Sequence, residues 1–527
     1  MELEDVTGIG AKTAERMKKA GITSIEKLAG IDLKELLKIK GIGKSSAESY
    51  IEEAKKILKS TEKEKAPKEK KPKKVPKEEE KPKKKPQKEE KEKPKKKPTK
   101  GKKENIKERI KGQAECNIGL VGHVDHGKTT LVQSLSGEWT DRHSEEQERG
   151  ISIKLGYSNA TILYCPQCDK YLTFHMAEEK REKGKPRFKC PHCQGDLEFK
   201  RNISFVDAPG HEILMATMLS GASLMDGACL LIAADEECPQ PQTREHLAAL
   251  DIAGIENVII VQNKIDAVSK PEAKRNYQQI KEFIKGTVAE DAPIIPISAI
   301  FSINIENVIR GFEEVIPTPK LSEDEEFQFL IARSFDINKP GTKIEKLNGG
   351  VIGGSVLKGK IEVGEKIEIR PGLKIKDKYQ PIRSEVVSIS QGRNFMDEAR
   401  PGGLIGLGTK LDPALTKGDS LIGHLVGKPD SLPEVIDEVE LDVHLLDRVI
   451  GTEDQIKVHE LKHNERLLIV IGTEKAAGTV VKILKNSYII KLNPPICPPE
   501  DFIFAISRII NRRYRLIGYG LRVNQEE

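Results

Sequence analysis

A glycine-rich stretch in the second hundred residues constrains this chain more than any other feature. The stretch from Gly122 to Thr130 matches the pattern Gly-x-x-x-x-Gly-Lys-Thr. It follows an apolar run, residues 117–121, that is typical of a buried strand, and it precedes a helical pattern. Between a strand and a helix, this pattern predicts a loop whose backbone N–H groups and lysine bind phosphate groups. We therefore expect a nucleotide site lined by Asp125, His126, Gly127, Lys128, Thr129 and Thr130.

A second motif, which runs from Asp207 to Gly210, follows a predicted strand at residues 203–207. The Asp207 carboxylate is suited to Mg²⁺, which the Thr129 hydroxyl is expected to bind as well. The Gly210 N–H can donate to a γ-phosphate. Because that hydrogen bond exists only when a triphosphate is bound, the motif predicts a loop that responds to the nucleotide.

A third motif, Asn263 to Asp266, follows a predicted strand at residues 258–262 and fits the pattern Asn-Lys-x-Asp. A carboxylate at Asp266 accepts hydrogen bonds from N1 and the 2-amino group of guanine. Adenine lacks both donors, so the motif predicts selection of GTP over ATP. The residues expected around the base are Asn263, Lys264, Asp266, Ser298, Ala299 and Ile300.

The motifs lie in a multidomain chain. Strands and helices alternate up to about residue 321, which predicts an α/β GTP-binding domain with its ligand at the carboxyl ends of the strands. Short β-rich runs separated by Gly and Pro follow, and they predict two closed β-barrels. The expected boundaries are 105–321 for the GTP-binding domain, 322–430 for the first barrel and 431–527 for the second barrel.

Residues 1–58 contain two similar units, each with an apolar-x-Gly-apolar-Gly turn at the start of a predicted helix. Lys12 follows the first turn and Lys44 follows the second. The segment resembles a tandem helix-hairpin-helix domain, a small all-α fold whose free N–H groups suit a sugar-phosphate backbone without reading bases. A small helical protein-binding module is the alternative.

Residues 59–104 hold 22 Lys against 10 Glu with almost no apolar side chains, which predicts a disordered basic linker. The linker either tethers the N-terminal domain and binds polyanions, or is only a solvated spacer. The rest of the chain is net negative, so a nucleic-acid surface there must be a local patch. The sequence has neither an apolar run of membrane-spanning length nor a secretory signal, so we expect a cytoplasmic protein without membrane contact.

Four of the eight cysteines form two Cys-x-x-Cys pairs between the first two motifs. Four thiolates at this spacing predict tetrahedral Zn²⁺ in a structural site within a zinc-ribbon insertion at about residues 163–197. The alternative is reduced cysteines without a metal. The predicted zinc ligands are Cys165, Cys168, Cys190 and Cys193.

The chain resembles the translational GTPases, and in particular the gamma subunits of archaeal and eukaryotic translation initiation factor 2. The resemblance covers about residues 114–523, outside which lie the helical N-terminus and the Lys-rich linker. The segments that carry it are 122–131, 149–157, 207–222 and 335–342.

This resemblance implies a GTPase whose catalytic residues are His211, Lys128 and Ser152. His211 corresponds to the residue that orients the attacking water, and a solvent-facing histidine is the alternative. We find no arginine finger in the sequence, so we expect slow hydrolysis until a partner assists. Most relatives carry Thr at the position of Ser152, which lies in the predicted first switch, residues 141–153. Ser keeps the hydroxyl but lacks the methyl group, so metal binding should survive while ordering of this switch weakens. The implied Mg²⁺ positions are Asp125, Thr129, Gly150, Ser152 and Asp207.

The resemblance also implies partners. In the GTP form the chain would bind methionylated initiator tRNA, together with alpha and beta subunits and the small ribosomal subunit, and release the tRNA after hydrolysis. Tyr157 corresponds to a position at the aminoacyl pocket between the GTP-binding domain and the first barrel, and a core tyrosine is the alternative. Arg512 and Arg513 are candidates for phosphate contacts, or simply arginines on an exposed strand face.

Two other functions fit parts of the sequence. A selenocysteine-specific or other tRNA-carrying elongation GTPase shares the nucleotide motifs, but we would expect it to have a further C-terminal domain. A DNA-binding protein fits the helix-hairpin-helix units and the cysteine pairs, but it leaves the nucleotide motifs unexplained.

Overall fold

The computed structural model divides the chain into two compact units, Met1–Pro98 and Thr99–Glu527. In the first unit the structure describes residues 17, 20, 22–31, 36, 50 and 54. In the second it describes residues 106–140, 155–181, 188–209, 215–320, 322–339, 341–376, 378–392, 394–449 and 456–523. The predicted linker and both glycine turns of the N-terminal units lie outside the described residues.

The described part of the N-terminal unit is helical with an apolar core. Helix α2 (Ile25–Gly30) begins after Ser24, whose side chain accepts a hydrogen bond from the backbone N–H of Lys27 at 3.5 Å. The residues that are fully buried here are Met17, Leu28, Leu36 and Ala54. Apolar side chains from positions well apart in the sequence are thus buried, as a small all-α domain requires.

The GTP-binding domain is built on a seven-stranded sheet in the order β3-β2-β4-β1-β5-β6-β7. Strands β4, β1, β5, β6 and β7 are parallel, and β2 and β3 add an antiparallel edge. Every residue of β1, β5 and β6 is buried, so both faces of the sheet must be covered. The strands are β1 (Cys116–Gly122), β2 (Gly156–Cys165), β3 (Lys170–Thr173), β4 (Glu198–Asp207), β5 (Gly227–Ala233), β6 (Val258–Asn263) and β7 (Ile294–Pro296).

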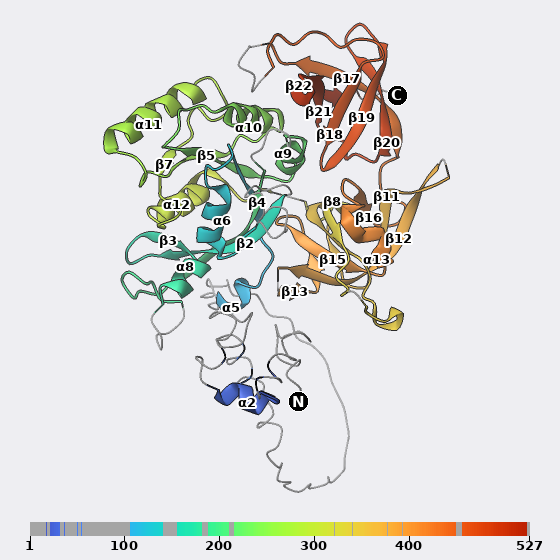
Figure 1. The fold of residues 1–527 in the computed structure, drawn as a ribbon. Coiled ribbons are helices and arrows are strands. Elements are labelled where there is room, and N and C mark those ends of the chain that lie inside the picture. Colours follow the sequence, from blue (N-terminus) through green and yellow to red (C-terminus); the bar gives the residue numbers. More distant parts are fainter. Residues whose placement is uncertain are drawn as a thin grey trace, which may run out of the picture. The chain divides into compact units, whose positions relative to one another are not determined.

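Helices cover the two faces of this sheet (Figure 1). Val121 of β1 joins an apolar core with residues of α9, α10 and α11, whereas Leu120 joins a second core with residues of α6, α8 and α12. Side chains of adjacent strand residues therefore enter opposite cores, as the pleat of a strand requires. The helices are α5 (Ile106–Arg109), α6 (Lys128–Ser136), α8 (Phe174–Glu179), α9 (Met215–Ala222), α10 (Pro241–Ile252), α11 (Lys270–Ile284) and α12 (Ile305–Val315).

The first barrel is a ring of six strands in the order β11-β16-β8-β9-β15-β12, closed by pairing of β12 with β11, with β13 attached to β12. Its core is apolar and includes Phe329, Ile369 and Leu407. The elements are β8 (Gln328–Phe335), β9 (Val351–Lys358), β10 (Ile361–Glu362), β11 (Lys366–Ile375), β12 (Lys378–Gln391), β13 (Asn394–Met396), β14 (Glu398–Ala399), β15 (Ile405–Thr409), β16 (Leu425–Gly427), the short helix α13 (Pro413–Thr416) and two 3-10 turns, Ile344–Lys346 and Lys417–Asp419.

The second barrel is a closed ring in the order β17-β20-β19-β18-β21-β22. The prediction of an α/β domain followed by two closed barrels is therefore confirmed. The strands are β17 (Ile436–Leu445), β18 (Arg466–Ile471), β19 (Glu474–Ile483), β20 (Tyr488–Ile496), β21 (Phe504–Ile510) and β22 (Arg513–Arg522).

Both barrels contact the GTP-binding domain. The Gln391 side chain of the first barrel accepts a hydrogen bond from the Ala114 N–H at 2.8 Å and donates to the Ser204 hydroxyl at 3.2 Å. Leu516 of the second barrel belongs to the same apolar core as Leu250 of α10. In the described part of the chain, no helix combines the length and apolarity that a membrane crossing needs.

A buried arginine ties β4 to the end of α12. Arg201 is 6% exposed, and its Nε donates to the Glu313 carboxylate at 2.6 Å. Its Nη2 donates to the carbonyls of Phe312 and Ile316, each at 2.8 Å. Because the last carbonyls of a helix lack partners within the helix, these bonds stabilise the C-terminal end of α12.

Replacement of Arg201 by Met should lower the free energy of unfolding by about 3 kcal/mol, because it leaves a buried carboxylate without its cation. Urea denaturation followed by circular dichroism measures this change. Arg310→Met is the matched control, since Arg310 lies on α12, the helix that Arg201 contacts, but is 33% exposed where it pairs with Asp169. We expect about 1 kcal/mol or less for the control. Equal losses in both variants would contradict the role of Arg201.

Candidate nucleotide and metal sites

The predicted phosphate loop connects β1 to α6. Gly127 caps α6 with φ 89°, in the left-handed region that favours glycine. A Cβ atom at this position would lie 2.3 Å from Nδ2 of Asn263, so a larger residue does not fit. Helix α6 begins directly after this loop, so its N-terminal end lies at the carboxyl edge of the sheet. The positive end of the helix dipole favours an anion there.

Lys128 is almost completely buried and reaches across this loop. Its Nζ donates to the carbonyl oxygens of Gly122 at 2.9 Å and His123 at 2.7 Å. Carbonyl oxygens hold an ammonium group without neutralising it. The positive charge is thus positioned over the loop, where phosphate oxygens can compete for it.

Three of the residues predicted to bind Mg²⁺ lie on the described part of the chain, and two of them, Thr129 and Asp207, meet, whereas Asp125 is exposed. The Thr129 hydroxyl donates to Oδ2 of Asp207 at 2.8 Å. The Thr140 hydroxyl donates to the same oxygen at 2.6 Å, a contact that the sequence did not predict. Hydroxyl and carboxylate oxygens suit Mg²⁺, so this pair fits the ion that the family implies. The other predicted switch residues, Gly150, Ser152, Gly210 and His211, lie outside the described residues.

Asn263, at the end of β6, joins the phosphate loop to the segment predicted to support the base. Its Nδ2 donates to the His126 carbonyl at 2.9 Å, and its Oδ1 accepts from the Ala299 N–H at 3.0 Å. Lys264 follows with φ 61° and donates to Asp235 at 3.0 Å. Asp266 is exposed, as recognition of a base from solution requires.

The segment after β7 also contacts the phosphate loop's helix. Ser298 is fully buried, whereas Ile300 is 72% exposed. The Ser134 hydroxyl of α6 donates to the Ala299 carbonyl at 2.9 Å. Because Ala299 is held through both its N–H and its carbonyl, this segment has a fixed orientation beside the loop.

Two buried histidines make contacts that the sequence did not indicate, His126 within the loop and His246 outside it. Burial lowers the pKa of His126 to about 4, so its ring is neutral at pH 7. Its Nδ1 lies 2.9 Å from the Leu231 carbonyl, and its backbone carbonyl accepts the hydrogen bond from Asn263. His246 of α10 accepts a hydrogen bond from the Gly122 N–H at 2.8 Å. No motif marks His246 in the sequence.

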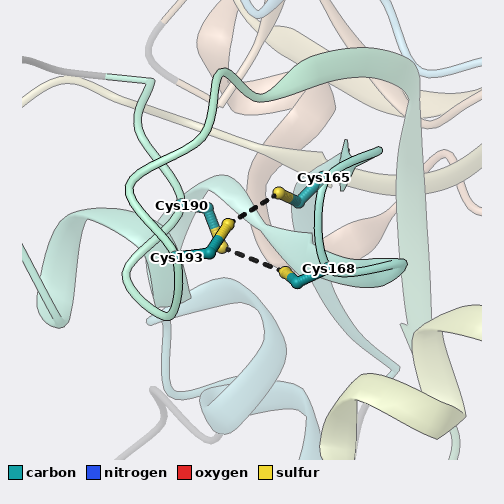
Figure 2. Close-up of side chains that lie close together, drawn as sticks. All are labelled: Cys165, Cys168, Cys190 and Cys193. Carbon is teal, nitrogen blue, oxygen red and sulfur yellow. Dashed lines mark hydrogen bonds between the residues drawn. The ribbon is translucent and has the colours of Figure 1, made fainter.

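The four predicted zinc ligands come together (Figure 2). Cys165 ends β2, Cys168 lies in the turn before β3, and the second pair lies on a separate loop. All four sulfur atoms lie within 4.8 Å of one another, with Cys165 3.4 Å from Cys193 and Cys168 3.6 Å from Cys190. Sulfur atoms bound to one zinc ion at about 2.3 Å in a tetrahedron lie about 3.8 Å apart. The cluster therefore fits Zn²⁺.

The environment of the cluster favours a thiolate at Cys165. Burial opposes that thiolate, yet hydrogen bonds from the Cys168 backbone and the Cys193 side chain lower the pKa of Cys165 to about 7. Burial raises the pKa of Cys168 and of Cys190. Glu306 of α12 contacts Lys170 at 2.9 Å and His192 at 2.6 Å, which anchors the insertion to the domain. His192, next to a ligand, is thereby held by an ion pair when it is protonated.

Tyr157 lines a pocket of about 690 Å³ between the GTP-binding domain and the first barrel. Its ring also packs against the apolar core of the GTP-binding domain, and burial raises the pKa of its hydroxyl. The residues that line the pocket include Trp139, Tyr157, Arg333, Phe335, Ile337 and Phe395. The pocket thus combines aromatic and apolar surface with one guanidinium group.

The arginines near the C-terminal end of the described chain separate into two kinds. Arg512 lies in the turn between β21 and β22, Arg513 begins β22, and both are exposed. Arg508 pairs with Glu465 inside the second barrel, and Arg515 pairs with Glu245 of α10. Only the first two therefore present exposed guanidinium groups at the tip of this hairpin.

Four family models match the chain. The Elongation factor Tu GTP binding domain matches residues 113–318, and Elongation factor Tu domain 2 matches residues 349–422. The model Initiation factor eIF2 gamma, C terminal, matches residues 437–521. The SAM-like Helix-hairpin-helix tandem matches residues 1–56, in agreement with the two N-terminal units of the sequence.

Among solved structures, the fold resembles the elongation factor SelB from Methanococcus maripaludis in complex with the GTP analogue GppNHp. The TM-score is 0.57 at 20% identity, and the match covers 79% of this chain and 80% of that one. The bacterial selenocysteine-specific elongation factor EF-Sec gives a TM-score of 0.58 at 21% identity, over 78% of this chain and 58% of that one. At these identities the likeness establishes the fold alone.

Sequence relatives are much closer. A translation initiation factor 2 subunit gamma from Pyrococcus abyssi is 54% identical over 419 residues, which are 79% of this chain and 99% of the relative. The subunit of the same name from Methanocaldococcus jannaschii is 53% identical over 418 residues, or 79% and 98% of the two chains. This chain therefore belongs to the gamma subunits of translation initiation factor 2, and it is a GTP-hydrolysing enzyme of the translational GTPases.

Proposed function

We propose that this chain, in its GTP form, binds methionylated initiator tRNA and delivers it to the small ribosomal subunit in the cytoplasm. It does so together with an alpha and a beta subunit, and it releases the tRNA after GTP hydrolysis. The names of relatives at 53–54% identity support this role over that of an elongation factor or a DNA-binding protein.

The observation that carries the proposal is the composition of the pocket beside Tyr157. Glu138 and Trp139 precede the predicted first switch, residues 141–153, and Tyr157 follows it. All three line the pocket. The opposite wall comes from the first barrel and includes Phe395, which is 79% exposed. A change in the switch that moves its ends changes the pocket, which therefore suits a ligand that binds one nucleotide state more tightly.

For the nucleotide, we assign the phosphates to the loop at residues 122–129 and the guanine base to Asn263, Asp266 and the Ser298–Ala299 segment. Bound Mg²⁺ would neutralise charge on the phosphates, held by Thr129 and Asp207 with Asp125 and the first-switch residues Gly150 and Ser152. The closeness of Thr129 to Asp207, 2.8 Å between oxygens, supports this assignment.

For hydrolysis, we assign His211 to orient the attacking water and Lys128 to stabilise charge on the transferred phosphoryl group. Gly210 N–H would donate to the γ-phosphate and so connect the second switch to the triphosphate state. Hydrolysis by positioning alone is slow, which leaves release of tRNA under the control of a partner.

We assign Zn²⁺ to the four-cysteine cluster as a structural ion, because four sulfur ligands leave no open position for chemistry. We also assign the N-terminal tandem to contact with a nucleic-acid backbone, since its two glycine turns are each followed by a lysine. Arg512 and Arg513, both exposed, are assigned to tRNA phosphates.

The tRNA proposal predicts at least 10-fold tighter binding of methionylated initiator tRNA with a non-hydrolysable GTP analogue than with GDP, because a switch requires different affinities in its two states. Filter binding of the full chain, assembled with its alpha and beta subunits, measures this ratio. Methionylated elongator tRNA serves as the control and should bind more weakly. Equal affinity with both nucleotides would refute the switch.

Substitution of Asp266 by Asn should weaken GDP binding by about 100-fold, because one of the two acceptors becomes an N–H donor that faces a donor of guanine, and the other loses its charge. The same variant should gain affinity for xanthosine diphosphate, whose 2-oxo group can accept from the new amide. Competition against a fluorescent GDP measures both affinities. Asp291→Asn, an exposed aspartate elsewhere in the domain, is the control and should leave GDP binding unchanged. An unaltered preference for guanine in the Asp266 variant would remove this residue from the base site.

The zinc assignment predicts one zinc ion per chain and its loss from a Cys190→Ser variant, as measured by atomic emission. Cys238→Ser, outside the cluster, should retain the ion. Zinc binds thiolates, so protons compete with the metal for all four sulfur atoms, and zinc affinity should fall as the pH falls. Competition with a chromophoric chelator at several pH values measures this trend. Affinity that rises toward low pH would contradict thiolate ligation.

A further inference from the structure

Helix α10 carries a buried histidine that contacts the first residue of the phosphate loop. His246 is 1% exposed, and its Nδ1 accepts a hydrogen bond from the Gly122 N–H at 2.8 Å. Because Nδ1 accepts this hydrogen bond, the single proton of the neutral ring must lie on Nε2. Burial, with the charge of Lys128 and the neighbouring histidines, holds the pKa of His246 well below its usual range, so the ring stays neutral.

Gly122 is held on both sides of its α-carbon. Its N–H donates to His246, and its carbonyl accepts from Nζ of Lys128 at 2.9 Å. Its φ is 139°, and a Cβ atom here would lie 2.3 Å from the Leu231 carbonyl oxygen. The orientation of the first peptide groups of the loop therefore depends on two side chains, only one of which is part of the sequence motif.

The residue before His246 connects α10 to the second barrel. Glu245 is 3% exposed, and its carboxylate accepts a hydrogen bond from Nη1 of Arg515, a residue of β22 that is 9% exposed. Burial raises the pKa of the Glu245 carboxyl, while the charge of Arg515 opposes that rise. Leu516, next to Arg515, shares an apolar core with Leu247 of the helix. An ion pair and apolar packing thus attach the helix to the barrel next to His246.

We propose that His246 is a positioning residue for the phosphate loop and that the second barrel holds it in place through the Arg515–Glu245 ion pair. This inference rests on the assignment of the 122–129 loop as the phosphate site. A shift of the second barrel acts on α10 through this ion pair. It thereby moves Nδ1 of His246, which accepts the hydrogen bond from the Gly122 N–H. The second barrel therefore influences, through α10, how fast nucleotide leaves the site.

Two substitutions at position 246 separate hydrogen bonding from packing. His246→Asn keeps an acceptor near the position of Nδ1 but loses volume, whereas His246→Leu keeps more apolar volume and has no acceptor. The release rate of fluorescent GDP from the full chain should rise about 10-fold or more with Leu, because a buried N–H loses its partner, and by less than about 3-fold with Asn. The reverse order would show that packing alone matters and would overturn the proposal.

Two arginines of adjacent strands provide a matched pair for the second step. Arg515→Met should raise the GDP release rate about 5-fold or more, since an uncompensated buried carboxylate remains beside His246. Arg508→Met removes an arginine that pairs with Glu465 within the same barrel, and it should leave the release rate unchanged. Glu245→Gln keeps an acceptor for Arg515 and should change the rate less than Arg515→Met. Equal effects of the two arginine substitutions would overturn the proposed connection.

A double substitution tests whether Arg515 acts through His246. In a chain that already carries His246→Leu, Arg515→Met should add little to the release rate, because the loop has lost its acceptor. Independent, multiplying effects would contradict the pathway. If the unaltered chain bound no guanine nucleotide, both this inference and the assignment of the nucleotide site would fail. Normal GDP binding with release rates unaffected by His246→Leu would refute the inference alone.

Discussion

Parallel pairing of β1 with β4 and β5, and of β5 with β6, is the constraint on which this site depends. Parallel strands end at the same edge of a sheet, so the loops after β1, β4 and β6 must lie side by side. Asn263 then completes the site with a single amide group, which bonds the His126 carbonyl and the Ala299 N–H. The residues that we assign to the phosphates, the metal and the base come from distant parts of the sequence, and those on the described part of the chain meet for this reason.

Several of the polar contacts that connect the domains are buried. Gln391 of the first barrel bonds the GTP-binding domain at Ala114 and Ser204, and Arg515 of the second barrel bonds it at Glu245. Buried polar groups are costly without partners, so these contacts specify how each barrel docks. A GTPase that reports its nucleotide state to a bound macromolecule needs such specific docking, because loosely attached domains would not transmit a change at the switches.

Much of the nucleotide site followed from the sequence. The phosphate loop, the Asp207 motif and the Asn263 motif are runs of neighbouring residues, and short-range backbone geometry dictates their residue types. The cysteine pairs were predictable for the same reason, since two ligands come from each short turn. Thr140 and His246 were not predictable, because their partners, Asp207 and Gly122, lie 67 and 124 residues away. A lone threonine or histidine has no local pattern that distinguishes it.

The sequence by itself determined the order of the domains, the chemistry of the nucleotide and cysteine motifs, and which strand ends carry them. These properties depend on apolar periodicity, turn residues and spacing, which are all local in the chain. Only the tertiary structure decided that Tyr157 both lines a pocket and packs against the apolar core, that Arg508 and Arg515 have different partners, and that α10 connects the second barrel to Gly122. Such contacts depend on how helices and barrels pack against one another, and that packing is a property of the whole fold.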